Sequence, residues 1–156
     1  GSEMCIRDRE ILADRPGVRF LSLFQWPLFP HRRMEPTPSN AVLSPLPAGA
    51  GGEEIRNVVE NVWLPEIDKF QPDLMILSAG FDAHCEERIA QLKAGEMDYA
   101  CVTRLLVEAS FAYCEGRLVS VLEGGYELRS LARSVFTHLQ GLIRNPLPAE
   151  TCKDPN

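Results

Sequence analysis

The sequence predicts an α/β fold in which a parallel sheet is covered by helices. Two apolar runs, residues 74–79 and 117–122, are predicted to be strands, and a helical pattern follows each of them. A chain that alternates strands and helices in this way typically forms a parallel sheet. Neither run alternates polar with apolar residues, which indicates strands that are buried on both faces by helices on both sides of the sheet.

Two further strands are expected nearer the amino terminus. Residues 18–25 follow a Pro-Gly turn, and residues 41–46 form a brief apolar run that its prolines keep short. The segment between them, residues 26–40, is rich in proline and is predicted to be a long loop. Loops of this length in compact domains are often functional.

Three helices are predicted from apolar residues that recur three and four positions apart, at residues 53–70, 96–115 and 127–143. Pro65 is expected to kink the first helix or to begin a second short one. Gly116 is expected to end the second helix. The positions expected to face the core are Met97, Ala100, Cys101, Leu105, Val107, Ala109 and Phe111 on the second helix, and Leu128, Leu131, Val135, Leu139 and Leu142 on the third.

Charge and hydropathy argue against several classes of protein. The formal net charge of −6 is unsuited to binding a phosphate backbone or to anchoring on an anionic membrane. No apolar run approaches the length of a membrane span, and the first residues are charged, unlike those of a signal peptide. We therefore expect a cytoplasmic protein that binds neither nucleic acid nor membrane.

The five cysteines are odd in number and scattered, and none forms a CxxC pair. This pattern favours reduced thiols over a disulfide framework and argues against a structural cysteine zinc site. Two histidines outside the main motifs, His31 and His138, are expected at the surface.

The chain is expected to contain one domain. Residues 1–9 resemble a cloning remnant and are expected to be a tag or artefact. Residues 10–145 are expected to belong to the domain, and residues 146–156 to form a loose tail.

Asp82 is the first candidate for chemistry, because it follows the strand at residues 74–79. Open α/β sheets bind ligands at the carboxyl ends of their strands, so Asp82 could be a metal ligand or an acid–base group. An aspartate that caps the following turn is an equally good interpretation. His84 is more typical of a solvated or helper histidine than of a ligand. Cys85 has no partner base except His84, so an incidental thiol is favoured over a nucleophile.

Tyr126 is the second candidate. It follows Gly124 and Gly125, which permit a tight turn or a close approach of the backbone. A phenol on such a turn can donate a hydrogen bond to a developing oxyanion, although packing against the next helix is a commoner role for an aromatic residue. A phosphate-binding turn is disfavoured, because Glu123 and Glu127 flank the glycines and would repel phosphate.

SAGFDAH at residues 78–84, followed about forty residues later by LVSVLEGGYEL at residues 118–128, resembles the histone deacetylase family. The likeness runs from roughly Asp14 to Ile143 and is closest to the bacterial branch near the class II and acetylpolyamine amidohydrolase enzymes. It implies a three-layer arginase/deacetylase-like fold, here truncated at its N-terminal side. It also implies zinc-dependent hydrolysis of the acetyl amide of a lysine or a polyamine.

The resemblance implies a role for each matched residue. Asp82 matches the aspartate that ligates the catalytic zinc. Tyr126 matches the tyrosine that hydrogen-bonds the substrate carbonyl and its tetrahedral oxyanion. The neighbouring residues expected to form the turn and the substrate pocket are Gly124, Gly125, Gly80 and Phe81.

The chain also departs from the family pattern. The family's other two zinc ligands and its paired catalytic histidines come from segments upstream of the matched region, so the zinc site is expected to be incomplete here. Asp82-Ala83-His84 is a D-x-H string but not the family's ligand pair, so His84 is not assigned to zinc. Phe24 stands where many members have a histidine, and the loop after Pro30 lacks the family's glycine-rich sequence.

We therefore expect the C-terminal part of a deacetylase, inactive on its own. A sheet cut at one side would expose an edge strand and apolar surface. The alternative is a non-catalytic α/β interaction fragment that folds by self-association. An arginase-like ureohydrolase is a weaker alternative, because Tyr126 after two glycines is explained by the resemblance to deacetylases.

Overall fold

The computed structural model of the chain describes residues 10–28, 37–143 and 152. Its strands are β1 (Phe20–Gln25), β2 (Ala41–Leu46), β3 (Met75–Ala79) and β4 (Leu118–Leu122). β1 pairs with β2 and β3 pairs with β4, both in parallel. The parallel pairing confirms the predicted α/β character. Each strand also ends at the residue that the sequence predicts.

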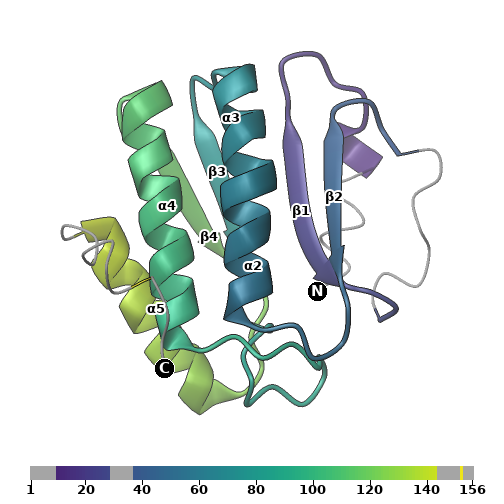
Figure 1. Cartoon of the computed structure of the whole chain (residues 1–156). Coiled ribbons are helices and arrows are strands. Elements are labelled where there is room, and N and C mark those ends of the chain that lie inside the picture. The colour runs from purple at the N-terminus through teal and green to yellow at the C-terminus, as the bar shows by residue number, and fades with distance from the viewer. Residues whose placement is uncertain (1–9, 29–36, 144–151, 153–156) are drawn as a thin grey trace.

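The helices are α2 (Gly52–Val58), the π-helix η1 (Val59–Trp63), α3 (Leu64–Phe70), α4 (Glu96–Cys114) and α5 (Leu128–Ile143). The first three form one continuous helical segment (Figure 1). Pro65 lies in the first turn of α3, directly after the π-helix η1, so the change predicted at this residue is a change of helix type within a continuous segment. α4 ends where Glu115 and Gly116 both take a positive φ, of 55° and 77°.

One face of the β3–β4 pair carries the main core. The helical segment α2–η1–α3 and helix α4 pack on this face (Figure 1). The buried side chains between them are Val59, Ile67, Leu105, Leu106 and Ala109. A smaller core, made of Leu46, Ala50 and Leu92, joins β2 to the segment that follows β3.

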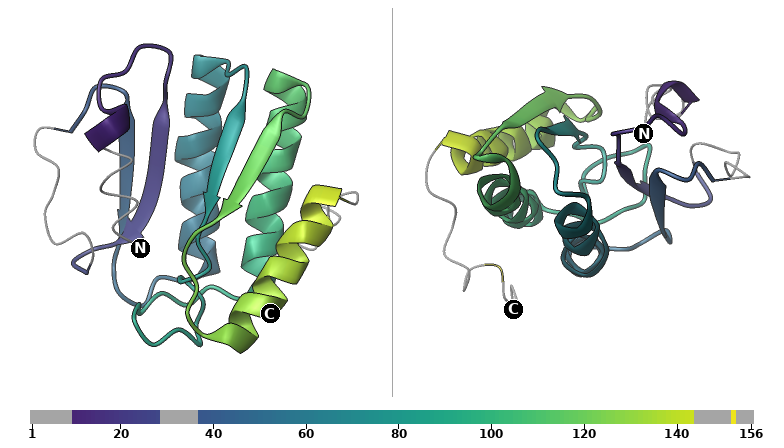
Figure 2. Two further views of the ribbon diagram at one scale, coloured as in Figure 1. Left: turned by 180° about the vertical axis from the view of Figure 1, so that it is seen from behind. Right: turned by 90° about the horizontal axis from the view of Figure 1, so that it is seen from above.

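The opposite face of β3 and β4 is not covered by the residues that the structure describes (Figure 2). Ile76 and Val119 are direct partners in the strand pair, and their side chains are 69% and 49% exposed. The expectation that both faces of these strands are buried is therefore not met within the described ranges. Apolar surface is exposed, as expected for a sheet that lacks part of its cover.

The described strands form two separate pairs instead of one sheet cut at its side. β1 and β2 lie to one side of the α2–α3 segment, and β3 and β4 lie behind it (Figure 1). A cavity separates β1 from β3. The interruption is therefore inside the sheet, where the sequence pattern gave no sign of it.

Helix α5 buries a polar stripe, which corrects part of the predicted core face, because Leu131, Val135 and Leu142 are only half-buried. Its buried residues are Ser130, Ser134 and His138, which follow one another at four-residue intervals. Leu128 and Leu139, predicted to be core residues, are 76% and 46% exposed. Small serine side chains let α5 approach α4 closely, and this contact takes precedence over burial of the apolar stripe. On α4, Met97 and Phe111 are likewise exposed rather than buried.

Cys101 on α4 forms a disulfide with Cys152, which corrects the expectation of reduced, scattered thiols. The two residues are 51 positions apart, and no spacing motif could have revealed the pair. Cys85 and Cys114 are free thiols. In the described ranges, no helix has the length and apolar character needed to cross a membrane. The proposed tag at residues 1–9, His31 and the tail other than Cys152 lie outside the described residues.

Candidate active site

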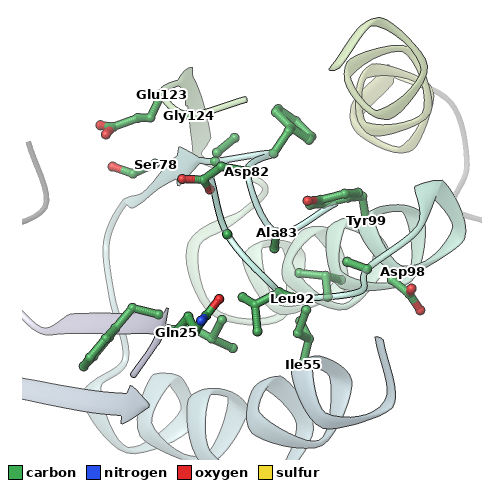
Figure 3. A pocket seen from close by; sticks show the side chains of 18 of the residues that line it. Gln25, Ile55, Ser78, Asp82, Ala83, Leu92, Asp98, Tyr99, Glu123 and Gly124 are labelled. Atoms are coloured by element: carbon green, nitrogen blue, oxygen red, sulfur yellow. The ribbon is translucent and has the colours of Figure 1, made fainter. Parts of the chain in front are cut away.

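A cavity of about 480 Å³ lies between β1, the α2–η1 segment and the carboxyl ends of β3 and β4. Asp82 and Tyr126 both line it, which brings the two sequence-predicted site residues to one place. Three of the predicted pocket residues, Gly80, Phe81 and Gly124, line it as well. Phe24, which stands where many family members have a histidine, contributes to the β1 wall. Figure 3 shows Asp82 beside Gly124, with Gln25 on another wall of the cavity.

Hydrogen bonds join the turn after β3 to the turn after β4. The amide of Glu123 donates to the carbonyl of Ala79 at 3.0 Å, and the amide of Phe81 donates to the carbonyl of Gly124 at 2.8 Å. These bonds continue the strand pairing past the last strand residues. As a result, the two predicted motifs lie side by side at the carboxyl end of the sheet, where α/β folds place their ligands.

Both glycines of the second turn are required by the geometry. A β-carbon on Gly124 would lie 2.8 Å from Asp82 Oδ2, closer than real contacts allow. Gly125 has a φ of 130°, which side chains rarely permit, and a β-carbon there would lie 2.7 Å from Leu131 Cδ1. Gly124 therefore leaves room for the Asp82 side chain next to the turn. Gly125 allows the backbone conformation that precedes Tyr126.

The position of Tyr126 depends on its backbone hydrogen bonds more than on side-chain packing, because the residue is 51% exposed. Its amide donates a 2.6 Å hydrogen bond to Oε1 of Glu87, and the amide of Glu127 donates to the same oxygen at 2.9 Å. Glu87 is buried and belongs to the segment between β3 and α4. Sequence reasoning missed this residue, because one acid among several in a polar loop carries no distinguishing signal.

His84 is buried, which excludes the solvated alternative of the prediction and leaves the helper role untested. The amide of Glu86 donates to His84 Nδ1 at 3.1 Å. This bond places the proton of the neutral ring on Nε2, which faces Glu96 Oε1 at 3.5 Å. One ring nitrogen thus faces a backbone amide and the other faces a carboxylate. Cys85 lies beside this ring, with Sγ 3.9 Å from Nδ1, and is exposed.

His138 is buried at the wall of the cavity, which corrects the prediction of a surface residue. Thr103 Oγ1 donates to the carbonyl of Tyr99 at 2.6 Å and lies 2.7 Å from His138 Nδ1, so Nδ1 must supply the proton of that contact. Nε2 then accepts from the hydroxyl of Ser120 at 2.8 Å. Burial lowers the pKa of His138, so the ring is neutral near pH 7.

Tyr99, next to this cluster, also lines the cavity. Its ring packs against Phe81, with the ring centroids 5.0 Å apart. Burial raises the pKa of its phenol above the usual value, and nearby acidic groups add to the effect, so the hydroxyl stays protonated. The cavity therefore has a wall of neutral aromatic and imidazole groups next to the carboxylate of Asp82.

The described residues do not make a complete metal site. Among them, no three His, Cys, Asp or Glu side chains lie close enough together to hold an ion. Asp82 is the carboxylate at the turn, and a catalytic zinc needs three protein ligands. At one end of this cavity the structure places the carboxylate of Asp82 and the half-exposed phenol of Tyr126.

Comparison with known proteins identifies the family. The family model described as the histone deacetylase domain matches residues 8–142. Histone deacetylase 10, chloroplastic, from Oryza sativa subsp. japonica is 32% identical over 90% of this chain, and polyamine deacetylase HDAC10 from Mus musculus is 37% identical over 64% of it. The solved HDA15 HD domain superposes with a TM-score of 0.79 over 93% of this chain at 26% identity.

Only part of each relative is represented. The chain spans 33% and 14% of the two relatives and 44% of the solved domain. The likeness in fold, together with the match of the family model to most of the chain, confirms that the chain has the α/β fold of arginase/deacetylase-like domains. The chain belongs to the histone deacetylase family.

Proposed function

We propose that the chain forms part of the catalytic domain of a zinc-dependent deacetylase, which hydrolyses the acetyl amide of a lysine side chain or of a polyamine. One observation supports this proposal above the others. The turn that carries Asp82 and the turn that carries Tyr126 are hydrogen-bonded to each other at one end of a single cavity. The relatives named as histone and polyamine deacetylases support the two substrate classes.

In this proposal Asp82 supplies one oxygen ligand to the zinc ion, and the phenol of Tyr126 donates a hydrogen bond to the carbonyl oxygen of the substrate. A bound zinc ion would polarise the acetyl carbonyl and acidify a water molecule. Apolar walls that include Phe24 and Leu92 would keep bulk water from the reacting amide. A neutral donor fixed next to the carbonyl stabilises the charge that develops on its oxygen.

We propose further that the 156-residue chain is inactive by itself. In this proposal Asp82 is one of the three ligands that zinc needs, and the described residues hold no group of three. The chain also spans less than half of the proteins it resembles. The remaining ligands would come from parts of the deacetylase domain that this chain does not span.

The test measures zinc content and turnover of an acetyl-lysine peptide and of an N-acetylated polyamine, in a protein that spans the full deacetylase domain and includes this chain. Asp82→Ala should lose both zinc and activity. Asp73→Ala, which changes an exposed aspartate at the other end of β3, is the matched control and should retain both. Full zinc occupancy and normal turnover in Asp82→Ala would refute the assignment of Asp82.

A second candidate role follows from the uncovered side of β3 and β4. Ile76 and Val119 expose a continuous apolar surface there, and such surfaces on soluble proteins usually mark an interface. We propose that, in the isolated chain, this surface drives self-association.

A further inference from the structure

The carboxylate of Glu87 holds the start of the Tyr126 turn from outside both sequence motifs. Its Oε1 accepts two hydrogen bonds, from the amide of Tyr126 at 2.6 Å and from the amide of Glu127 at 2.9 Å. The Glu87 side chain is buried, so water competes little for these donors. Hydrogen bonds to an ionised acceptor are about twice as strong as those between neutral groups.

The segment that carries Glu87 is itself fixed to its surroundings. The amide of Cys85 donates to the carbonyl of Ala94 at 2.8 Å, and the amide of Ala94 donates to the carbonyl of Ala83 at 3.0 Å. The amide of Glu87 donates to the carbonyl of His84 at 2.9 Å. Glu87 therefore belongs to a hydrogen-bonded loop that starts directly after Asp82. The loop fixes the position from which the Glu87 carboxylate reaches the Tyr126 turn.

Tyr126 needs such an attachment because its own backbone provides little restraint. Two glycines precede it, and glycine has the greatest conformational freedom of any residue. Its ring is half-exposed, so packing does not fix the direction of the side chain. The two hydrogen bonds to Glu87 are what ties the first residues after the Gly-Gly turn to the rest of the cavity.

We infer that Glu87 is a positioning residue, whose carboxylate fixes the backbone of Tyr126 so that the phenol is directed at the substrate carbonyl. The inference rests on the proposed role of Tyr126 as a hydrogen-bond donor in a deacetylase. The simpler interpretation is that Glu87 only caps α5, because the amides it binds precede Leu128 and have no partner within the helix.

Glu127 offers a matched control for that simpler interpretation. Its Oε2 accepts from the amide of Ser130 at 2.7 Å, so it caps the same helix without binding the Tyr126 amide. If Glu87 only caps α5, then Glu87→Ala and Glu127→Ala should affect the enzyme alike. If Glu87 positions Tyr126, then only Glu87→Ala should slow the reaction.

The experiment uses a protein that spans the full deacetylase domain and measures kcat, KM, zinc content and melting temperature. Glu87→Ala should lower kcat roughly tenfold or more, because small misplacements of a reacting group are costly, while KM and zinc content stay the same. Glu87→Gln, whose amide oxygen can still accept both hydrogen bonds, should recover most of the rate. Glu127→Ala should keep kcat. Should Glu87→Ala fail to fold, Glu87→Asp, which is one methylene too short, takes its place.

A double variant separates this inference from the proposed function. If Glu87 acts through the phenol, Glu87→Ala combined with Tyr126→Phe should be no slower than Tyr126→Phe alone. An unchanged kcat in Tyr126→Phe would refute the proposed function itself. A slow Tyr126→Phe together with a normal Glu87→Ala, or equal effects of Glu87→Ala and Glu127→Ala, would refute only the role of Glu87.

Discussion

The carboxylate of Asp82 lies so close to Gly124 that a β-carbon there would come within 2.8 Å of Asp82 Oδ2. The two residues are 42 positions apart in the sequence and belong to different turns. Gly124 therefore leaves space for the carboxylate of Asp82. It also belongs to the turn that leads to Tyr126. A change at Gly124 should reach the cavity through Asp82.

Gly124→Ala should push the carboxylate of Asp82 out of place. Overpacking of this kind typically costs about 1–3 kcal/mol of stability. In a protein that spans the full deacetylase domain, zinc content should fall as well, because the proposed ligand is displaced. Gly51→Ala is the control, since a β-carbon there meets nothing closer than 3.7 Å. Equal zinc content in Gly124→Ala and Gly51→Ala would contradict the dependence of Asp82 on Gly124.

Tyr126→Phe removes only the phenolic hydroxyl. In the longer protein we expect kcat to fall about a hundredfold or more, by analogy with the loss of one oxyanion donor, while zinc content stays unchanged. Tyr113→Phe, on the far end of α4, should behave like the unmodified protein. The measurement is steady-state turnover of an acetylated peptide together with metal analysis, and a fall in KM alone would argue against the assignment.

The buried His138 should make the stability of the fold depend on pH. Burial lowers the pKa of its imidazole in the folded chain, so the unfolded chain takes up the proton more readily. The free energy of unfolding should therefore fall as the pH drops below about 6.5, the usual pKa of an unfolded histidine, towards the lower folded pKa. His138→Gln should show a flatter dependence between pH 7 and pH 5 in urea denaturation. Identical pH profiles would rule out this contribution.

The uncovered face of β3 and β4 should cause the 156-residue chain to self-associate. Ile76→Lys combined with Val119→Lys places charges on that face and should shift the chain towards the monomer in analytical ultracentrifugation. Ile11→Lys changes an equally exposed apolar residue elsewhere and should not. A chain that is monomeric before any substitution would contradict the proposed self-association.

Much of the fold could be predicted because its local signals agree with one another. The strands before Gly80 and Glu123 are apolar runs that are followed by turn residues. All four described strands end at the residue that the sequence predicts. The position of Asp82 at a ligand-binding edge followed from the rule that open α/β sheets bind ligands at the carboxyl ends of their strands. These features depend on residues that are close in sequence or on general rules of topology.

Other features could not be predicted, because they depend on contacts between distant segments. Helix α5 has an apolar stripe and a serine face, and only the presence of α4 decides that Ser130 and Ser134 are buried. The buried ring of His138 has hydrogen-bond partners on both sides. Nδ1 donates to a hydroxyl on α4, and Nε2 accepts from a hydroxyl on β4. Glu87 reaches the amide of Tyr126 from 39 residues away in the sequence, a contact that no local pattern signals.

The segment after Asp82 ties together parts of the molecule that no strand pairing connects. The amide of Gln91 donates to the side chain of Gln25 at the end of β1, and the amide of Lys93 donates to the carbonyl of Ala50 before α2. Surface loops usually tolerate insertions and proteolytic nicks. A nick or an insertion within residues 85–93 would loosen the hydrogen bonds that this segment makes to Gln25 and Ala50, so the loop should tolerate such changes less well than an ordinary surface loop.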